Sequence, residues 1–298
     1  MTDLAVYMEG VSKEYPHFTL ADINLALPTG SIMGFIGANG AGKSTTIRIL
    51  MGLVHPDRGT VRILGKAMPE QQADAKRDIG FASEDMRLYK GATVQWHMEF
   101  MRSIDPKWDQ PYAELLVKRF DLRAQQKMKG LSHGQRVKTA LLLQLARRPR
   151  LLVLDEPTTG LDPVARQEVL GELMEILADD QRTIFFSSQN TLDVEQISDR
   201  ITFIDRGRVI DTGDKESFLD RWRRVRLDVP PGVVLPALPG VIGTAGSGRL
   251  AVVTMSRFEP AMAAAYHDAG ATVHAVDNMT LEEIFVANVM SRREGKVA

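Results

Sequence analysis

Short apolar runs alternate with amphipathic segments over roughly the first 215 residues of the chain. The apolar runs have the length of strands and cover 4–11, 18–27, 32–36, 60–64, 79–82, 151–154, 183–186 and 201–204, with a turn at Gly207 before Val209 and Ile210. Helical spacing of apolar residues covers 43–53, 71–77, 164–177 and 192–197, and fills most of 93–147. This alternation predicts an α/β fold, with a helical insertion in the middle.

The pattern changes near residue 225. The stretch VPPGVVLPALPGVIGTAGSG, residues 229–248, is rich in proline and glycine and interrupts the periodicity. Strands at 250–254 and 272–275 and helices at 259–268 and 281–290 follow, and Thr280 with Glu283 fits a capping box. We therefore expect a large domain over 1–224, with a helical subdomain at about 85–148, and a small accessory α+β domain over 225–298.

Composition narrows the class of protein. The 298 residues carry a formal net charge of −1, so we expect no nucleic-acid partner. The chain has no cysteine, which excludes disulfides and thiolate chemistry. The sequence contains neither a run of about 18 apolar residues nor a signal-peptide pattern at the start, so any role at a membrane is expected to need a partner.

The stretch GANGAGKS, from Gly37 to Ser44, matches the phosphate-binding P-loop pattern between a predicted strand and a predicted helix. Glycines let the backbone N–H groups turn toward phosphate, and the helix N-terminus adds positive potential. Lys43 is expected to reach the β- and γ-phosphates, and Ser44 to ligate Mg²⁺. The nucleotide-binding residues expected here are Gly37, Asn39, Gly40, Ala41, Gly42, Lys43, Ser44 and Thr45.

The stretch LLVLDEP, residues 151–157, is an apolar strand that ends in two carboxylates. Asp155 fits the acid that supports Mg²⁺ in P-loop NTPases. Glu156 would orient or deprotonate the attacking water, although an acid at a strand end can also be merely solvated. In LSHGQ, residues 131–135, a hydroxyl residue and a glycine precede a long helix; this fits either a second anion site or a simple helix cap.

The order and spacing of these stretches, with TTGLDP after LLVLDEP, resemble the nucleotide-binding subunit of an ABC transporter over residues 4–219. The sequences IGFASEDMRLY and DPKWD are similar to those of ATPase subunits of bacterial ABC-2-type exporters. The C-terminal part of the chain, with TLEEIF, also resembles that group, though less specifically. The resemblance implies a P-loop NTPase fold of the ABC type, ATP and Mg²⁺ as cofactors, and a dimer in which each P-loop faces the other subunit's LSHGQ.

The resemblance also assigns roles to single residues. Tyr15 matches the aromatic residue that stacks on adenine, although it could instead pack on the core as a strand-end aromatic. Ser132, Gly134 and Gln135 match residues of the signature motif that meets the ATP of the other subunit, and His133 between them is expected to be an exposed bystander. Asp162 matches an aspartate at the dimer interface, and it could equally cap the following helix.

Two positions depart from the family pattern. Glu84 stands where the family usually has glutamine, and an acid there can still ligate Mg²⁺ or hold a water. Gln189 stands where the family has its switch histidine. An amide can hydrogen-bond a γ-phosphate oxygen, but it cannot become a cation near neutral pH, so turnover is expected to be slow.

The expected function is ATP hydrolysis that powers export through a separate membrane permease, with the chain at the cytoplasmic face of the membrane as a homodimer or heterodimer. Two alternatives remain: a soluble ABC ATPase that acts on nucleic acid or ribosomes, and a regulatory ATP-binding subunit with little turnover. A further basic stretch, RWRRVR at 221–226, fits a solvated helix end or a contact with lipid headgroups.

Overall fold

The structure is a computed structural model that describes residues 3–83, 86–176, 182–293 and 295. The chain divides into two compact units, Met1–Asp211 and Thr212–Ala298. Sequence patterning put a domain boundary thirteen residues later, between 224 and 225. The role of the second unit as an accessory domain stays a prediction.

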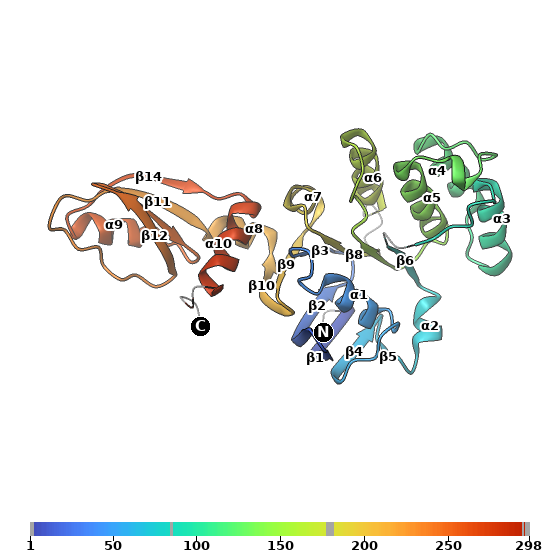
Figure 1. Cartoon of the computed structure of the whole chain (residues 1–298), viewed down its shortest axis with the longest axis horizontal. Coiled ribbons are helices and arrows are strands. Elements are labelled where there is room, and N and C mark those ends of the chain that lie inside the picture. Colours follow the sequence, from blue (N-terminus) through green and yellow to red (C-terminus); the bar gives the residue numbers. More distant parts are fainter. Residues whose placement is uncertain (1–2, 84–85, 177–181, 294, 296–298) are drawn as a thin grey trace. The chain divides into compact units, whose positions relative to one another are not determined.

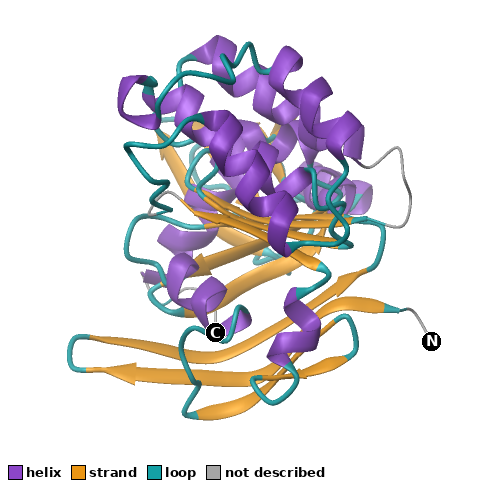
Figure 2. Cartoon of the chain, turned by 90° about the vertical axis from the view of Figure 1, so that its right-hand side faces the viewer, coloured by secondary structure: helices purple, strands orange, loops and turns teal. Residues whose placement is uncertain are grey.

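Two sheets form the first unit (Figure 1). The first is antiparallel, in the order β2-β1-β4-β5, from β1 (Leu4–Tyr15), β2 (Phe18–Pro28), β4 (Arg58–Ile63) and β5 (Lys66–Met68). Figure 2 shows β1 as the long strand that follows the N-terminus. The second has the order β10-β9-β3-β8-β7-β6, from β3 (Ile32–Ile36), β6 (Ile79–Ser83), β7 (Leu151–Asp155), β8 (Thr183–Ser188), β9 (Arg200–Asp205) and β10 (Arg208–Asp214).

The central strands of the second sheet are parallel, since β3 pairs with β8 and β9, and β7 pairs with β6 and β8. The side chains of β3, β7 and β8 are buried at every position, which fits the continuous apolar runs in the sequence. The carboxyl ends of these strands therefore meet at one edge, where ligands bind in open α/β sheets.

Helices connect these strands. They are α1 (Lys43–Leu50), α2 (Gln72–Lys76), α3 (Val94–Ile104), α4 (Gln110–Arg119), α5 (His133–Leu145), α6 (Pro163–Ile176) and α7 (Thr191–Ile197), with a 3₁₀ turn at Met128–Gly130. In Figure 1, α3, α4 and α5 lie together beside the β6 end of the sheet. They form the helical insertion that the sequence pattern predicts. The alternating strands and helices confirm the predicted α/β class.

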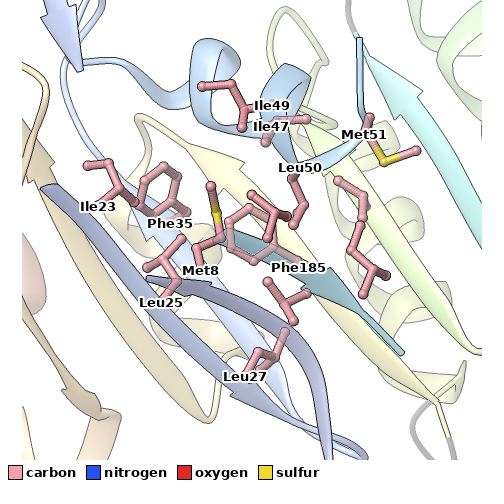
Figure 3. Close-up of a cluster of buried hydrophobic side chains, with 14 of the residues drawn as sticks. Met8, Ile23, Leu25, Leu27, Phe35, Ile47, Ile49, Leu50, Met51 and Phe185 are labelled. Carbon is pink, nitrogen blue, oxygen red and sulfur yellow. The ribbon is translucent and has the colours of Figure 1, made fainter. Parts of the chain in front are cut away.

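A shared core joins the two sheets to α1 (Figure 3). Met8, Leu25, Phe35 and Phe185 come from four different strands and are nearly or fully buried. The rings of Phe35 and Phe185 lie 5.5 Å apart, centroid to centroid. Apolar residues of α1, such as Leu50, pack into the same cluster, so burial of one face of α1 fixes the loop that precedes it.

The second unit contains α8 (Lys215–Arg221), β11 (Arg223–Asp228), β12 (Val241–Ser247), β13 (Leu250–Met255), α9 (Pro260–Asp268), β14 (Thr272–Asn278) and α10 (Leu281–Arg293). Its sheet has the order β12-β13-β11-β14. Val225, Leu227, Val253, Met255 and Tyr266 form its core. The predicted capping box is confirmed, since Thr280 N–H donates to Glu283 Oε2 at 2.9 Å and Glu283 N–H to Thr280 Oγ1 at 3.3 Å.

The basic stretch at 221–226 corrects the expectation of a solvated helix end. Most of it lies in β11, an inner strand of this sheet, in which buried Val225 alternates with arginines. Arg226 pairs with Asp277 at 2.6 Å, and Arg224 with Glu283 at 2.5 Å. Alternation of apolar and basic residues has the period of a half-buried strand, and the density of arginine concealed it in the sequence.

Candidate functional site

The P-loop lies between β3 and α1, as the sequence predicts. Gly40 and Gly42 have φ angles of +77° and +114°, a region that side chains other than glycine rarely adopt. A Cβ atom at Gly37 would lie 2.6 Å from the backbone oxygen of Ile204. These three glycines therefore allow a path of the loop that other residues would block.

Lys43, the first residue of α1, curls back over its own loop. Its side chain is 5% exposed, and Nζ donates to the carbonyl oxygens of Gly37 at 2.7 Å and Ala38 at 3.2 Å. Nζ also lies 3.0 Å from Glu156 Oε1. The ammonium group is thus held at the point where the loop and the end of β7 meet, and its charge is balanced by a carboxylate.

A cleft of about 470 Å³ opens over the loop, lined by His17, Phe18, Asn39, Gly40, Gly42, Lys43, Ser44, Thr45 and Glu156. The structure therefore brings most of the predicted nucleotide-binding residues together with Glu156. Tyr15 ends β1 beside this cleft, with 40% of its surface exposed and its ring 6.5 Å from that of Phe18. This exposure argues against the alternative that Tyr15 packs on the core.

The sequence did not single out His17 and Phe18 as residues of the cleft. They follow Tyr15 by two and three positions, in the turn between β1 and β2 and at the start of β2. Their only signal was proximity to an aromatic residue already assigned to the base.

Asp155 and Glu156 stand at the carboxyl end of β7, next to the end of β8. Asp155 pairs in register with Ser187, whose hydroxyl donates to Asp155 Oδ1 at 2.7 Å. The backbone N–H of Glu156 donates to the same hydroxyl oxygen at 3.0 Å. Ser187 is fully buried. One serine thus fixes the carboxylate of Asp155 and the backbone of Glu156, a role that the sequence did not reveal.

Glu156 has an unusual backbone conformation, with φ at +54°. Its Oε2 accepts a hydrogen bond from Thr159 Oγ1 at 2.9 Å and a longer one from the backbone N–H of Gln189 at 3.4 Å. The carboxylate is therefore oriented from three sides, by Lys43, Thr159 and the start of the segment after β8. The side chain of Gln189 is exposed, and its predicted catalytic role stays a prediction.

The LSHGQ stretch forms the N-terminus of α5. Ser132 is the N-cap: its Oγ accepts from Gln135 N–H at 3.2 Å, and Gln135 Oε1 accepts from Ser132 N–H at 3.0 Å. The helix-cap interpretation is confirmed. A Cβ at Gly134 would lie 3.5–3.6 Å from Ala165 and Leu161, so this helix end packs against the start of α6. The contact of the signature residues with a second subunit's ATP stays a prediction.

Asp162 caps α6, since its Oδ1 accepts from the N–H groups of Val164 and Ala165, both at 3.0 Å. These backbone donors, Ala165 first, lower the pKa of the Asp162 carboxyl below its ordinary value. The capping alternative is thus confirmed for Asp162, and its role at a dimer interface stays a prediction.

His133 corrects the expectation of an exposed bystander. The side chain is half-buried, and Nε2 lies 3.0 Å from the carbonyl oxygen of Thr159. A carbonyl can only accept, so Nε2 is the donor. The sequence offered no signal for this contact because the two residues are 26 positions apart.

The site can be tested for its fit to Mg²⁺. The residues described contain no group of three or more His, Cys, Asp or Glu side chains that could hold a metal ion by themselves. Mg²⁺ beside a nucleotide needs only one or two protein ligands, because phosphate and water supply the rest. Ser44 in the cleft and Asp155 at the adjoining strand end fit that requirement. Glu84, the third predicted ligand, lies outside the described residues.

Residues 20–159 match the family model described as ABC transporter. Linearmycin resistance ATP-binding protein LnrL of Bacillus subtilis (strain 168) is 32% identical over 219 residues, which cover 72% of this chain and 70% of the relative. The chain belongs to the ATP-binding proteins of ABC transporters. The family implies that this ABC ATPase binds and hydrolyses ATP.

Two further similarities extend this assignment. Daunorubicin resistance ATP-binding protein DrrA3 of Streptomyces coeruleorubidus is 28% identical over 304 residues, 96% of each chain, so the similarity includes the second unit. A solved structure described as an ATP-binding subunit of an ABC transporter has a TM-score of 0.66 and 25% identity, and the match covers 72% of this chain and 92% of that one. In the described part of this ABC ATPase, no helix is long and apolar enough to cross a membrane.

We expect Ser187→Ala to lower the kcat of ATP hydrolysis about tenfold and the free energy of unfolding by about 1–2 kcal/mol, because two hydrogen bonds at Asp155 and Glu156 are lost. Steady-state ATPase kinetics and urea unfolding measure the two effects. Ser198→Ala is the matched control, since Ser198 is also buried but its hydroxyl has no hydrogen-bond partner among the residues described. Equal losses of kcat in both variants would contradict the prediction.

Proposed function

We propose that this ABC ATPase hydrolyses Mg-ATP to power export of a substrate through a separate membrane permease. The observation that carries the proposal is the meeting of Glu156 and Lys43, 3.0 Å apart, in the cleft formed by the P-loop. The family implies ATP hydrolysis, and this contact supports Glu156 as the carboxylate that would act on water beside a bound phosphate.

Lys43 and the loop amides would bind the phosphates, with Ser44 and Asp155 holding Mg²⁺, which neutralises charge on the transferring group. The phosphates would compete with Glu156 for the Lys43 ammonium. Binding of ATP would therefore release the Glu156 carboxylate from its ion pair and leave it free to orient and deprotonate water. Thr159 would keep that carboxylate in place through its 2.9 Å hydrogen bond.

A dimer is part of the proposal, either of two copies or with a homologue. The N-terminus of α5, where Ser132 is the N-cap, would face the nucleotide of the other subunit. Asp162 would lie at the same interface. ATP would hold the closed pair together, and hydrolysis followed by product release would reopen it. Closure would follow from the higher affinity of the closed state for ATP.

The permease partner is supported by an exposed aromatic stripe on α3. Trp96, Phe100 and Ile104 are spaced four residues apart and are 42%, 45% and 60% exposed. Trp96 stacks on Phe100 at 5.4 Å between centroids, and Tyr89 meets Trp96 edge-on at 5.6 Å. Large apolar groups left in water on one helix face mark an interaction surface.

A groove adjoins this stripe. It has a volume of about 430 Å³ and is lined by Met51, Leu53, Lys76, Ile79, Phe81, Met101, Ile104, Asp105, Gln144 and Arg147. Its largely apolar lining, with a few charged groups, would accept an amphipathic cytoplasmic segment of the permease. The chain would thereby attach to the inner face of the membrane.

The relatives' names support export as the direction of transport, because LnrL and DrrA3 are both described as resistance ATP-binding proteins. A formal net charge of −1 disfavours the alternative of an ATPase acting on nucleic acid. The alternative of a regulatory subunit with little turnover depends on Gln189. Steady-state kinetics of wild type and Gln189→His separate it from the proposal.

The proposed dimer predicts the behaviour of Glu156→Gln. The amide keeps the shape of the side chain but removes the base, so the ATP-bound closed state should accumulate. We expect a shift from monomer to dimer in size-exclusion chromatography when Mg-ATP is added. A variant that binds ATP but stays monomeric at saturating ATP would refute either the dimer model or the role of Glu156.

The proposed permease surface predicts the behaviour of the double variant Trp96→Asp with Phe100→Asp. Charges on the aromatic stripe should reduce co-purification with the proposed membrane permease at least about tenfold. ATP hydrolysis by the isolated subunit should stay within about twofold of wild type. Leu115→Asp is the matched control, since Leu115 is 41% exposed on α4. Retained co-purification of the double variant would exclude this surface.

Glutamine at position 189, in place of the switch histidine, leads us to predict slow hydrolysis. Loss of a charge-assisted hydrogen bond at the transferring phosphate would cost about 1–3 kcal/mol, or a slowing of about 5- to 150-fold. We therefore expect Gln189→His to raise kcat more than it changes KM in a homodimer, since Lys43 and the loop amides still bind ATP. Steady-state kinetics of both proteins test this. An unchanged kcat would show that position 189 does not limit turnover, or that a homologue supplies the histidine.

A further inference from the structure

We infer that His133 is a positioning residue for ATP hydrolysis, acting on Glu156 of its own chain through Thr159. This inference rests on the proposed role of Glu156 as the base. It gives a function to a residue of the LSHGQ stretch that the proposed function leaves unused.

The first step is the bond between α5 and the loop after β7. His133 Nε2 donates to the carbonyl oxygen of Thr159 at 3.0 Å, and the imidazole is half-buried. The same ring lies against Gly160, where an added Cβ would be 3.2 Å from Nε2 and 3.3 Å from Cδ2. Gly160 has a φ angle of +71°, so glycine fits both the turn and the ring.

The second step runs through the side chain of Thr159. Its Oγ1 donates to Glu156 Oε2 at 2.9 Å, while Oε1 of the same carboxylate faces Lys43. The backbone and side chain of Thr159 are therefore held by different partners. A carbonyl fixed by His133 limits the movement of Thr159, and the hydroxyl transfers that restraint to the carboxylate.

The third step is that the backbone of Thr159 is weakly held without this bond. The neighbouring Thr158 is anchored by its side chain, whose Oγ1 donates to Asp193 Oδ2 at 2.5 Å, but this contact does not reach the Thr159 carbonyl. Within the loop, Thr159 N–H reaches the carbonyl oxygen of Glu156 at 3.3 Å, and Leu161 N–H that of Thr158 at 3.2 Å, both long hydrogen bonds. Glu156 itself has a left-handed backbone. His133 and Thr159 also line one cavity of about 80 Å³ with Glu156, so space exists for the loop to shift if the imidazole is removed.

The consequence is that α5 helps to orient the base in its own subunit. Ser132 and Gly134, on either side of His133, are proposed to meet the nucleotide of the other subunit. A displacement of the α5 N-terminus on dimer closure would therefore reach Glu156 through His133 and Thr159. The coupling travels through two hydrogen bonds and needs no change in the protonation of the imidazole.

The test combines variants at both positions in the full chain. We expect His133→Ala to lower kcat about fivefold and Thr159→Val about tenfold, each with the KM for ATP within about twofold of wild type. The double variant should be no more than about twofold slower than Thr159→Val, because His133 acts through Thr159. His133→Gln, whose amide can still donate to the carbonyl, should recover most of the activity.

A second measurement needs no nucleotide. Hydrogen exchange of backbone amides at 158–162 should be faster in His133→Ala than in wild type and slower again in His133→Gln. His55→Ala, which removes an exposed histidine, is the control and should change neither exchange in this loop nor kcat.

Several results would overturn the inference. They are an unchanged kcat and exchange rate in His133→Ala, effects of the two single variants that multiply in the double variant, or a His133→Gln protein as slow as His133→Ala. A change in KM or in ATP-dependent dimerisation with unchanged loop exchange would instead place His133 on the other subunit's nucleotide. A wild-type chain without ATP hydrolysis would refute the proposed function, while loop exchange would still report on the contact itself.

Discussion

The parallel pairing of β3, β7 and β8 is the constraint on which the site depends. These strands are buried along their whole length, so their register is fixed by packing on both faces. Because they run in the same direction, their carboxyl ends meet at one edge of the sheet. The P-loop is thereby brought together with the two carboxylates of β7 and the segment after β8, which lie more than a hundred residues farther along the chain.

Stability and chemistry share the same contacts at this edge. The left-handed backbone of Glu156 costs on the order of 1–3 kcal/mol, and buried Ser187 helps to hold it by accepting the Glu156 N–H. Lys43 and Glu156 are both largely buried, and their ion pair means that neither charge is buried without a partner. A ligand that brings its own negative charge to Lys43 therefore changes the environment of Glu156 directly.

The second unit follows a different rule. Its antiparallel sheet packs one face into a small core, and its polar positions pair across the strands, as Arg226 does with Asp277. Arginines that look like a basic patch in the sequence are neutralised by acids brought in from β14 and α10. Its similarity to DrrA3 over nearly the whole chain shows that the two units occur together in that relative as well.

The sequence by itself determined the α/β class, the positions of nearly all strands and helices in the first unit, and the residues of the P-loop, because these depend on local periodicity and on a contiguous motif. For the same reason it predicted Asp155 and Glu156 at the end of β7, and their chemical roles stay predictions. It missed β11, since four arginines in the stretch 221–226 obscured the alternation of a half-buried strand.

Only the tertiary structure decided which residues hold Glu156 in place. Ser187 and His133 lie 31 and 23 positions from it in the chain, Lys43 is farther still, and no local pattern relates them. Such contacts arise from strand register and from the packing of α5 on the loop after β7. The sequence therefore assigns no role to a side chain such as His133, which becomes a hydrogen-bond donor to Thr159 only when the chain folds.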